Sequence, residues 1–305
     1  MKKILKIIGI VLIIFIVGSI IIVSARQNLK YDGPYPSITA SKDSNVIARG
    51  KHLVNSIAHC ADCHSKANAD SLIALGLDVP LSGGVEFKLP VGSIYSANIT
   101  SDSIYGIGKF TDAQIARVLR FGIHPNGNAV YDFMPFHNLS DEDLTAILSY
   151  LRTQKPVASK KPENSLNMVG KIVNAFLVKP IGPSENIPHS VTPDTTAEYG
   201  RYLVLNVANC SGCHTKRSLS GAYTGKLLAG GSDMNGNIPP NLTPDSSSRI
   251  FGWTEDVFIA RFKAGKLIPT SEMPWNTFKR MTNNELKAIY KYLHTIEPAK
   301  TDSKS

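Results

Sequence analysis

Two short motifs contain all four cysteines of this 305-residue chain. Both have the pattern Cys-x-x-Cys-His: Cys60-Ala61-Asp62-Cys63-His64 and Cys210-Ser211-Gly212-Cys213-His214. The pattern is a signal for c-type haem attachment, in which both thiols bond to the porphyrin and the adjacent imidazole binds the iron. The sequence therefore predicts two covalently attached haem c groups, bound through Cys60, Cys63, Cys210 and Cys213, with His64 and His214 as iron ligands.

Two other uses of these cysteines compete with haem. Four cysteines in an exported chain often form two structural disulfides, and sets of Cys and His also bind zinc. A zinc site needs a fourth ligand, and no repeated candidate lies near the motifs. A histidine directly after each pair favours haem over zinc or a redox disulfide.

A six-coordinate iron needs a second axial ligand from each half. Met134 and Met273 are at equivalent places, and each precedes a proline, whereas Met168 and Met234 have no counterparts. Proline keeps the local backbone out of a helix and lacks an N–H group, so the sulfur can be presented on a loop. We expect Met134 and Met273 to bind the irons. Histidine with methionine raises the reduction potential, which suits transfer to a high-potential acceptor.

The two motifs belong to a longer internal repeat. Residues 47–155 and 197–298 contain the same marks in the same order: Gly-Gly, Asn-Ile-Thr or Asn-Leu-Thr, an aromatic residue followed by Thr, and Met-Pro. The offset between the copies falls from 150 residues at the cysteines to 139 at the methionines, so the loops differ in length. Two copies of one fold are predicted.

The periodicity of apolar residues predicts helices. Leu144, Ile147, Leu148 and Leu151, and likewise Leu286, Ile289, Tyr290 and Leu293, form one apolar helical face in each half. Capping signals precede these helices, Ser140 with Asp143 and Thr282 with Glu285, and Thr111 with Gln114 marks another start. Residues 44–59 and 196–209 also read as helices. Convincing alternating strands are absent, so the fold is predicted to be mostly α.

Five segments follow from these observations. Residues 1–25 are an anchor or signal, residues 44–155 and 197–298 are the two copies, residues 156–196 are a proline-rich linker, and residues 299–305 are a polar tail. Within the linker, Leu166, Val169, Val173, Phe176 and Leu177 predict a short amphipathic helix. We expect the apolar face of this helix to pack against the two copies, and the alternative is that it lies on a membrane surface.

The N-terminal segment predicts export. Ile7–Val23 is an uncharged apolar run of 17 residues, about 25 Å long as a helix, and Lys2, Lys3 and Lys6 favour a cytoplasmic N-terminus. An uncleaved anchor in the cytoplasmic membrane is favoured over a cleaved signal, because the run exceeds the usual signal length. The body would then lie on the outer, periplasmic face. Its small excess of basic residues is only weak support for nucleic-acid binding, and no nucleic-acid partner is expected.

The order of these marks resembles that of class I cytochrome c domains. The tandem is similar to the membrane-bound cytochrome c subunits of bacterial alcohol and gluconate dehydrogenases, over nearly all of residues 45–298. The resemblance implies that Gly50 and Gly200 let the first helix of each copy approach the last, near Tyr150 and Tyr292. Those subunits usually carry three haems and a C-terminal membrane segment, whereas this chain has two motifs and an N-terminal segment.

Two functions fit this pattern. The first is an electron carrier between an extracytoplasmic dehydrogenase or quinol-oxidising donor and a downstream cytochrome or oxidase. The alternative is a dihaem cytochrome c peroxidase, which would need one iron with an open distal site. Matched Met-Pro pairs favour the carrier. The other six histidines are expected to be loop or surface residues.

Overall fold

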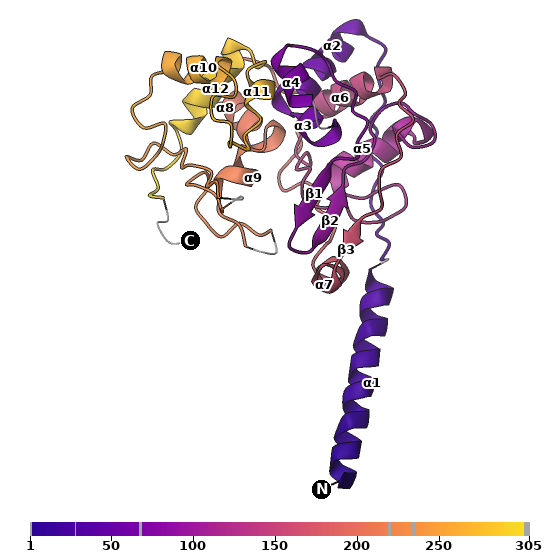
Figure 1. The fold of residues 1–305 in the computed structure, drawn as a ribbon. Coiled ribbons are helices and arrows are strands. Elements are labelled where there is room, and N and C mark those ends of the chain that lie inside the picture. The colour runs from indigo at the N-terminus through magenta and orange to yellow at the C-terminus, as the bar shows by residue number, and fades with distance from the viewer. Residues whose placement is uncertain (1, 28, 67–68, 219–220, 234–235, 302–305) are drawn as a thin grey trace.

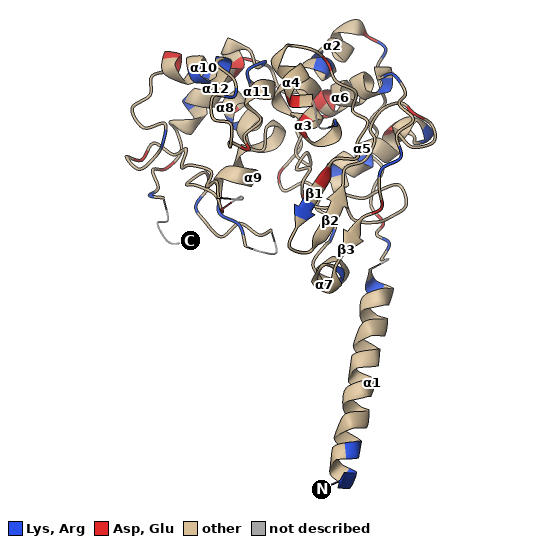
Figure 2. Cartoon of the chain, viewed as in Figure 1, with Lys and Arg blue, Asp and Glu red and all other residues tan. Residues whose placement is uncertain are grey.

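The computed structural model describes residues 2–27, 29–66, 69–218, 221–233 and 236–301. Figure 1 shows a helix-rich body from which one long helix, α1 (Lys2–Arg26), projects. None of α1 is buried, and its mean hydropathy reaches 3.2, so it is long and apolar enough to cross a membrane. Figure 2 shows that the charged residues of α1 lie only towards its two ends. Since α1 has no packing partner along most of its length, its apolar surface is suited to lipid.

Corresponding helices occur in the two halves of the body. The first half contains α2 (Ser44–His52), α3 (Cys60–His64), α5 (Asp112–Phe121) and α6 (Asp141–Thr153). The second half has the matching helices α8 (Ala197–Tyr202), α9 (Cys210–His214), α10 (Glu255–Lys263) and α12 (Asn283–Leu293). The first helix of each half packs against the last, α2 on α6 and α8 on α12. This order agrees with the internal repeat in the sequence.

Glycine permits both helix crossings. A Cβ on Gly50 would lie 1.8 Å from the carbonyl oxygen of Ala146, and one on Gly200 would lie 1.9 Å from that of Ala288. In each half the next nearest side chain is a tyrosine, Tyr150 or Tyr292. No larger residue fits without separating the helices, so the expected role of Gly50 and Gly200 is confirmed.

The helix before each cysteine pair ends in a π-helical turn, which the sequence did not predict. These turns are η1 (Leu53–Ile57) and η3 (Leu203–Val207). The N–H of Ala58 donates to the carbonyl of Leu53, and the N–H of Ala208 to that of Leu203, each at 2.8 Å. The helices predicted over 44–59 and 196–209 are therefore each α-helical at the start and π-helical in the last turn, ending at Ile57 and Val207. Turns of this kind are rare in proteins, and those that do occur often lie at functional sites.

The prediction of a mostly α fold is confirmed, although three short strands that the sequence did not indicate are present. Strands β1 (Glu86–Leu89), β2 (Gly92–Tyr95) and β3 (Ser165–Leu166) form one antiparallel sheet in the order β1-β2-β3. Strands of two to four residues are too short to show a clear alternating pattern. Because β3 lies in the linker, this sheet ties residues 165–166 to the first half.

The remaining elements are short and lie in the connections. They are α4 (Ala69–Ala74), the 3₁₀ turn η2 (Ile107–Lys109), α7 (Met168–Phe176) and α11 (Trp275–Phe278). The predicted linker helix is therefore confirmed as α7. Its expected packing is confirmed only in part, since Val173 is half-buried whereas Val169, Phe176 and Leu177 are exposed.

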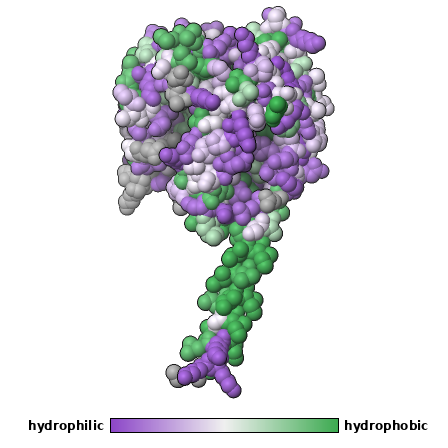
Figure 3. Space-filling view, turned by 45° about the vertical axis from the view of Figure 1, so that its right-hand side comes forward, coloured by the Kyte–Doolittle hydropathy of each residue, from purple (hydrophilic) through white to green (hydrophobic). Residues whose placement is uncertain are grey.

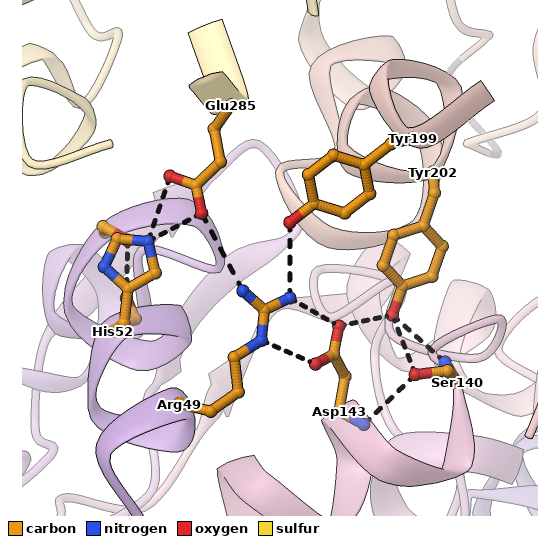
Figure 4. Close-up of polar contacts among 8 residues, drawn as sticks. Arg49, His52, Ser140, Asp143, Tyr199, Tyr202 and Glu285 are labelled. Atoms are coloured by element: carbon orange, nitrogen blue, oxygen red, sulfur yellow. Dashed lines mark hydrogen bonds and ion pairs between the residues drawn. The ribbon is translucent and has the colours of Figure 1, made fainter. Parts of the chain in front are cut away.

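The two halves share one apolar core and a polar contact between the α2 and α8 regions. Figure 4 shows Arg49 between Asp143 and Tyr199, with both nitrogen–carboxylate distances to Asp143 near 3 Å, at 2.9 and 3.0 Å. His52 lies 2.8 Å from a carboxylate oxygen of Glu285, and the hydroxyl of Tyr202 donates to Asp143 at 2.9 Å. Each of these last two bonds joins one half to an acidic residue in the first turn of the last helix of the other half. Asp143 therefore does not complete the predicted capping box with Ser140; its carboxylate binds Arg49 and Tyr202 instead.

Candidate haem sites

Each Cys-x-x-Cys-His motif forms a single helical turn, α3 or α9, preceded by a left-handed residue. The residue before the first cysteine is His59, with φ of 38°, in one half and Asn209, with φ of 50°, in the other. Positive φ is unfavourable for residues other than glycine and is retained where the surroundings require it. The backbone thus reverses sharply at the same point in both motifs, which sets the direction of the cysteines and histidine that follow.

The motif histidines make matched hydrogen bonds. Nδ1 of His64 lies 2.7 Å from the carbonyl oxygen of Ala97, and Nδ1 of His214 lies 2.7 Å from that of Pro240. A carbonyl can only accept, so Nδ1 carries the proton and Nε2 keeps its lone pair. Burial lowers the pKa of both imidazoles despite these bonds, which favours the neutral form. A neutral ring held by its Nδ1–H is the arrangement found in histidines that bind a metal.

The cysteines are neither bonded to one another nor arranged for zinc. No disulfide joins the four thiols. Burial raises the pKa of Cys60 and of Cys210 to about 12, and that of Cys63 to about 11, so the thiols are protonated at neutral pH. Within the described residues, no group of three or more His, Cys, Asp or Glu side chains could hold a metal ion. The zinc and redox-disulfide alternatives therefore gain no support.

The first site faces a cavity of about 720 Å³. Cys60, Cys63 and His64 line it together with Met134, and apolar side chains of the flanking helices complete the wall, among them Ile115, Leu119, Ile147 and Leu151. Cofactor pockets are mostly apolar clefts of roughly 300–1,000 Å³. The predicted donor residues and a volume suited to a large planar group thus occur together, and the residues present fit a haem.

The second site is built from the equivalent elements. His214 is buried, and Met273 packs against the apolar core just before α11. Phe258 and Phe262 of α10 stand where Ile115 and Leu119 line the first cavity. Arg261 replaces Val118, and its guanidinium stacks 3.6 Å from the centroid of the Trp275 ring. Compared with α5, the helix α10 therefore has aromatic residues at two aliphatic positions and a positive charge beside Trp275.

The two candidate sites adjoin each other. The hydroxyl of Thr277, four residues after Met273, donates to Asp62 inside the first motif at 2.8 Å. The ring of His59 packs edge-on against Phe278 at 5.3 Å, and Asn209 of the second half lines the first cavity. His59 was expected to be a loop or surface histidine, and the structure instead places it between the halves. Its position just before the cysteine pair was the only signal for this.

A repeated Asn-x-Thr turn supports the loops that carry the carbonyl acceptors. Asn98 follows Ala97, and its carboxamide oxygen accepts from the N–H and hydroxyl of Thr100. Asn241 follows Pro240 and makes the same two bonds with Thr243. Both asparagines are almost fully buried. These turns are therefore structural, and they hold the acceptors of the motif histidines in place.

The proteins that this chain resembles in sequence include cytochrome c subunits of dehydrogenases. An alcohol dehydrogenase (quinone) cytochrome c subunit of Gluconacetobacter polyoxogenes is 30% identical over 284 residues, covering 85% of this chain and 58% of that protein. The fructose dehydrogenase cytochrome subunit of Gluconobacter japonicus is 29% identical, covering 93% of this chain and 59% of that protein.

The chain is similar to the cytochrome c subunits of bacterial dehydrogenases. It spans somewhat less than two thirds of the length of these relatives. A dihaem c-type cytochrome of Cereibacter sphaeroides is 29% identical over 193 residues, covering 61% of this chain and 63% of that protein. No family model matches the chain. These relatives support haem c and electron transfer and give no support to the peroxidase alternative.

Proposed function

We propose that this chain is a membrane-anchored dihaem cytochrome c. It transfers electrons from an extracytoplasmic dehydrogenase or a quinol-oxidising donor to a downstream cytochrome or oxidase. The observation that carries the proposal is the pair of buried histidines with matched 2.7 Å bonds to backbone carbonyls, each directly after a cysteine pair. A haem iron, when bound, supplies reversible one-electron chemistry, and the protein supplies ligands, orientation and exclusion of water.

Each half is proposed to hold one haem as a separate class I cytochrome c domain. In the first, residues 44–155, Cys60 and Cys63 attach the haem while His64 and Met134 bind its iron. In the second, residues 197–298, the corresponding residues are Cys210, Cys213, His214 and Met273. The repeated elements and the cavity between the first motif and Met134 support this assignment. The contacts of Asp62 and His59 with the second half favour transfer between the two haems inside one molecule.

The anchor is proposed to be α1, crossing the cytoplasmic membrane once with the body on the periplasmic side. Its 25 residues span about 37 Å as a helix, enough for a hydrocarbon core of about 30 Å. The lysines at its N-terminal end favour the cytoplasmic side for that end.

Spectra of the two methionine variants test the ligands. In the ferric protein, Met134→Ala and Met273→Ala should each remove about half of the far-red charge-transfer band from sulfur to iron, and the double variant should remove it all. The intact mass should show two haem additions in every variant, since the thiols are unchanged. Met168→Ala, at an unmatched and exposed methionine, is the control and should leave the band intact.

Two results would contradict the proposal. One is a high-spin or bis-histidine haem in the unaltered protein with turnover of hydrogen peroxide, which would favour the peroxidase. The other is a mass without haem additions from a host that matures c-type cytochromes.

A further inference from the structure

The helix α7 exposes apolar side chains beside the end of α1. Met168, Val169 and Ile172 are 65%, 60% and 45% exposed, and Phe176, Leu177 and Ile181 continue the apolar surface. Figure 1 shows α7 next to the body end of α1 and lying across its direction, and Figure 3 shows apolar surface where the α1 stalk meets the body. We define Met168, Val169, Ile172, Phe176 and Leu177 as the α7 face.

The position of α7 is fixed by contacts on its other side. A Cβ on Gly170 would lie 2.0 Å from the carbonyl oxygen of Val91, so the backbone of α7 rests directly on the β1–β2 turn. Asn167 caps the helix by accepting from the N–H of Gly170, and its amide donates to the carbonyl of Pro90. Ala175 is buried. The small residues Gly170 and Ala175 thus face the body, and apart from the half-buried Val173 the large apolar side chains of α7 lie outside together with Lys171.

The same helix is joined to the end of α1. Nε of Arg26 donates to the carbonyl of Ala175 at 3.2 Å, and its guanidinium lies 4.9 Å from the centroid of the Phe176 ring. The side chain of Asn174 donates to the carbonyl of Gln27 at 3.3 Å. Arg26 is the first charged residue after the apolar run of α1, so it marks the level of the lipid headgroups. These bonds place the α7 face at that same level.

We propose that the α7 face lies in the outer leaflet of the membrane, with α7 parallel to the bilayer surface. The proposal rests on the anchor proposed above, because α1 sets the height of the membrane. Continuity with α1 selects lipid as the occupant, and α7 contains no acidic residue to repel anionic headgroups. Interfacial helices bury their apolar face about 5–10 Å into the boundary between headgroups and acyl chains.

The consequence concerns the first haem site. Arg26, Gln27, Asn174 and Val178 line the same cavity as Cys60 and Met134. The floor of this cavity is therefore formed by the residues that join α1 to α7. With α7 in the interface, the first site is held close to the bilayer at a fixed orientation, and the body cannot rotate freely about the end of α1.

Lipid labelling of the full-length haem-loaded protein tests this placement. The protein is reconstituted into phosphatidylcholine–phosphatidylglycerol vesicles that contain a phospholipid with a photoreactive diazirine in its acyl chain, and labelled peptides are mapped by mass spectrometry. We expect labelling of residues 168–177 together with α1. The matched control is Val257 of α10, an exposed valine on a helix far from α1 in Figure 1, whose peptide should be almost unlabelled.

The double variant Val169→Ser with Ile172→Ser should lower labelling of residues 168–177 several-fold and leave that of α1 unchanged, whereas Val257→Ser should change neither. Label on α1 with no more on residues 168–177 than on α10, in the unaltered protein, would overturn the proposal and leave the anchor standing. Absence of label from α1 would overturn the anchor, and this proposal with it. Loss of the α7 label in a purified complex with a partner subunit would assign the face to protein contact instead.

Discussion

At the scale of single residues, the buried asparagines Asn98 and Asn241 each join two separate segments of the chain by hydrogen bonds. The amide of Asn98 donates to the carbonyls of Val157 and Ser159, at 2.8 and 3.2 Å, while its oxygen binds Thr100. Asn241 donates to the carbonyl of Ala299 at 2.6 Å. Each asparagine therefore joins the loop that supports a motif histidine to the segment after the last helix of its half. When a buried carbonyl loses its hydrogen-bond donor, its desolvation free energy is no longer offset, and the folded protein is destabilised.

Asn98→Ala should therefore destabilise the protein by about 1–3 kcal/mol, and Asn241→Ala by a similar amount. The comparison is Asn284→Ala, an exposed asparagine in the first turn of α12, which should change the stability little. Chemical unfolding of the haem-loaded protein, followed by circular dichroism, measures all three. Equal stability of Asn98→Ala and Asn284→Ala would show that the buried bonds contribute nothing.

At the scale of elements, the predictions succeeded where a local pattern determines the structure. The apolar periodicity of residues 144–151 and 286–293 gave helices α6 and α12, and both Thr capping boxes, at Thr111 and Thr282, are present. The π-turns and the three strands were not predictable in this way. A π-turn of five residues is too short for apolar periodicity to distinguish its wider turn from an α-helical one. The pairing of β3 with β2 depends on where the linker folds back.

The crossing of α2 over α6 and of α8 over α12 gives a prediction at this scale. Gly50→Ala and Gly200→Ala should each destabilise the protein by at least about 1–3 kcal/mol, the usual cost of overpacking, because the added methyl group meets backbone rather than a movable side chain. Gly18→Ala is a helical control with nothing within 4 Å of the added atom. Thermal unfolding in detergent compares the three variants, and a neutral result at Gly50 would contradict the close crossing.

At the scale of the whole molecule, a small set of charges connects the halves. Arg49, His52, Asp143 and Glu285 come from three helices, and the side chains of Asp143 and Glu285 are almost completely buried. Burial raises the pKa of Glu285, but hydrogen bonds from His52 and Thr282 outweigh it, so the net pKa lies below its usual value of 4.5. A carboxyl group with a lowered pKa stabilises the folded protein above its unfolded pKa and loses that contribution as the pH falls through its folded pKa.

The stability of the protein should therefore fall as the pH drops below 4.5, the usual pKa of a glutamate, in part because Glu285 becomes protonated. Glu285→Gln should be less stable at neutral pH and should lose less stability over that acidic range. Glu297→Gln, at an exposed glutamate, should follow the unaltered protein. Unfolding by urea at several pH values measures the difference, and curves for Glu285→Gln that run parallel to those of the unaltered protein would exclude this role.

Much of the candidate site could be inferred from sequence alone, because covalent attachment requires residues in a fixed local order. The carbonyl acceptors of Ala97 and Pro240 could not be inferred, since any residue type offers a carbonyl and only the fold brings it to the histidine. The same holds for His59 and Asp62. Neither residue belongs to a pattern that predicts a contact, and their contacts with Phe278 and Thr277 depend on how the two halves pack together.

The paired π-turns bear on the history of the chain. A five-residue π-helical turn is rare, yet η1 and η3 have the same length and the same distance to the first cysteine. Independent origin of the same rare irregularity at the same place twice is a poor explanation. We infer that the two halves descend from one ancestral sequence that already had this turn, and that both kept it while their loops came to differ in length.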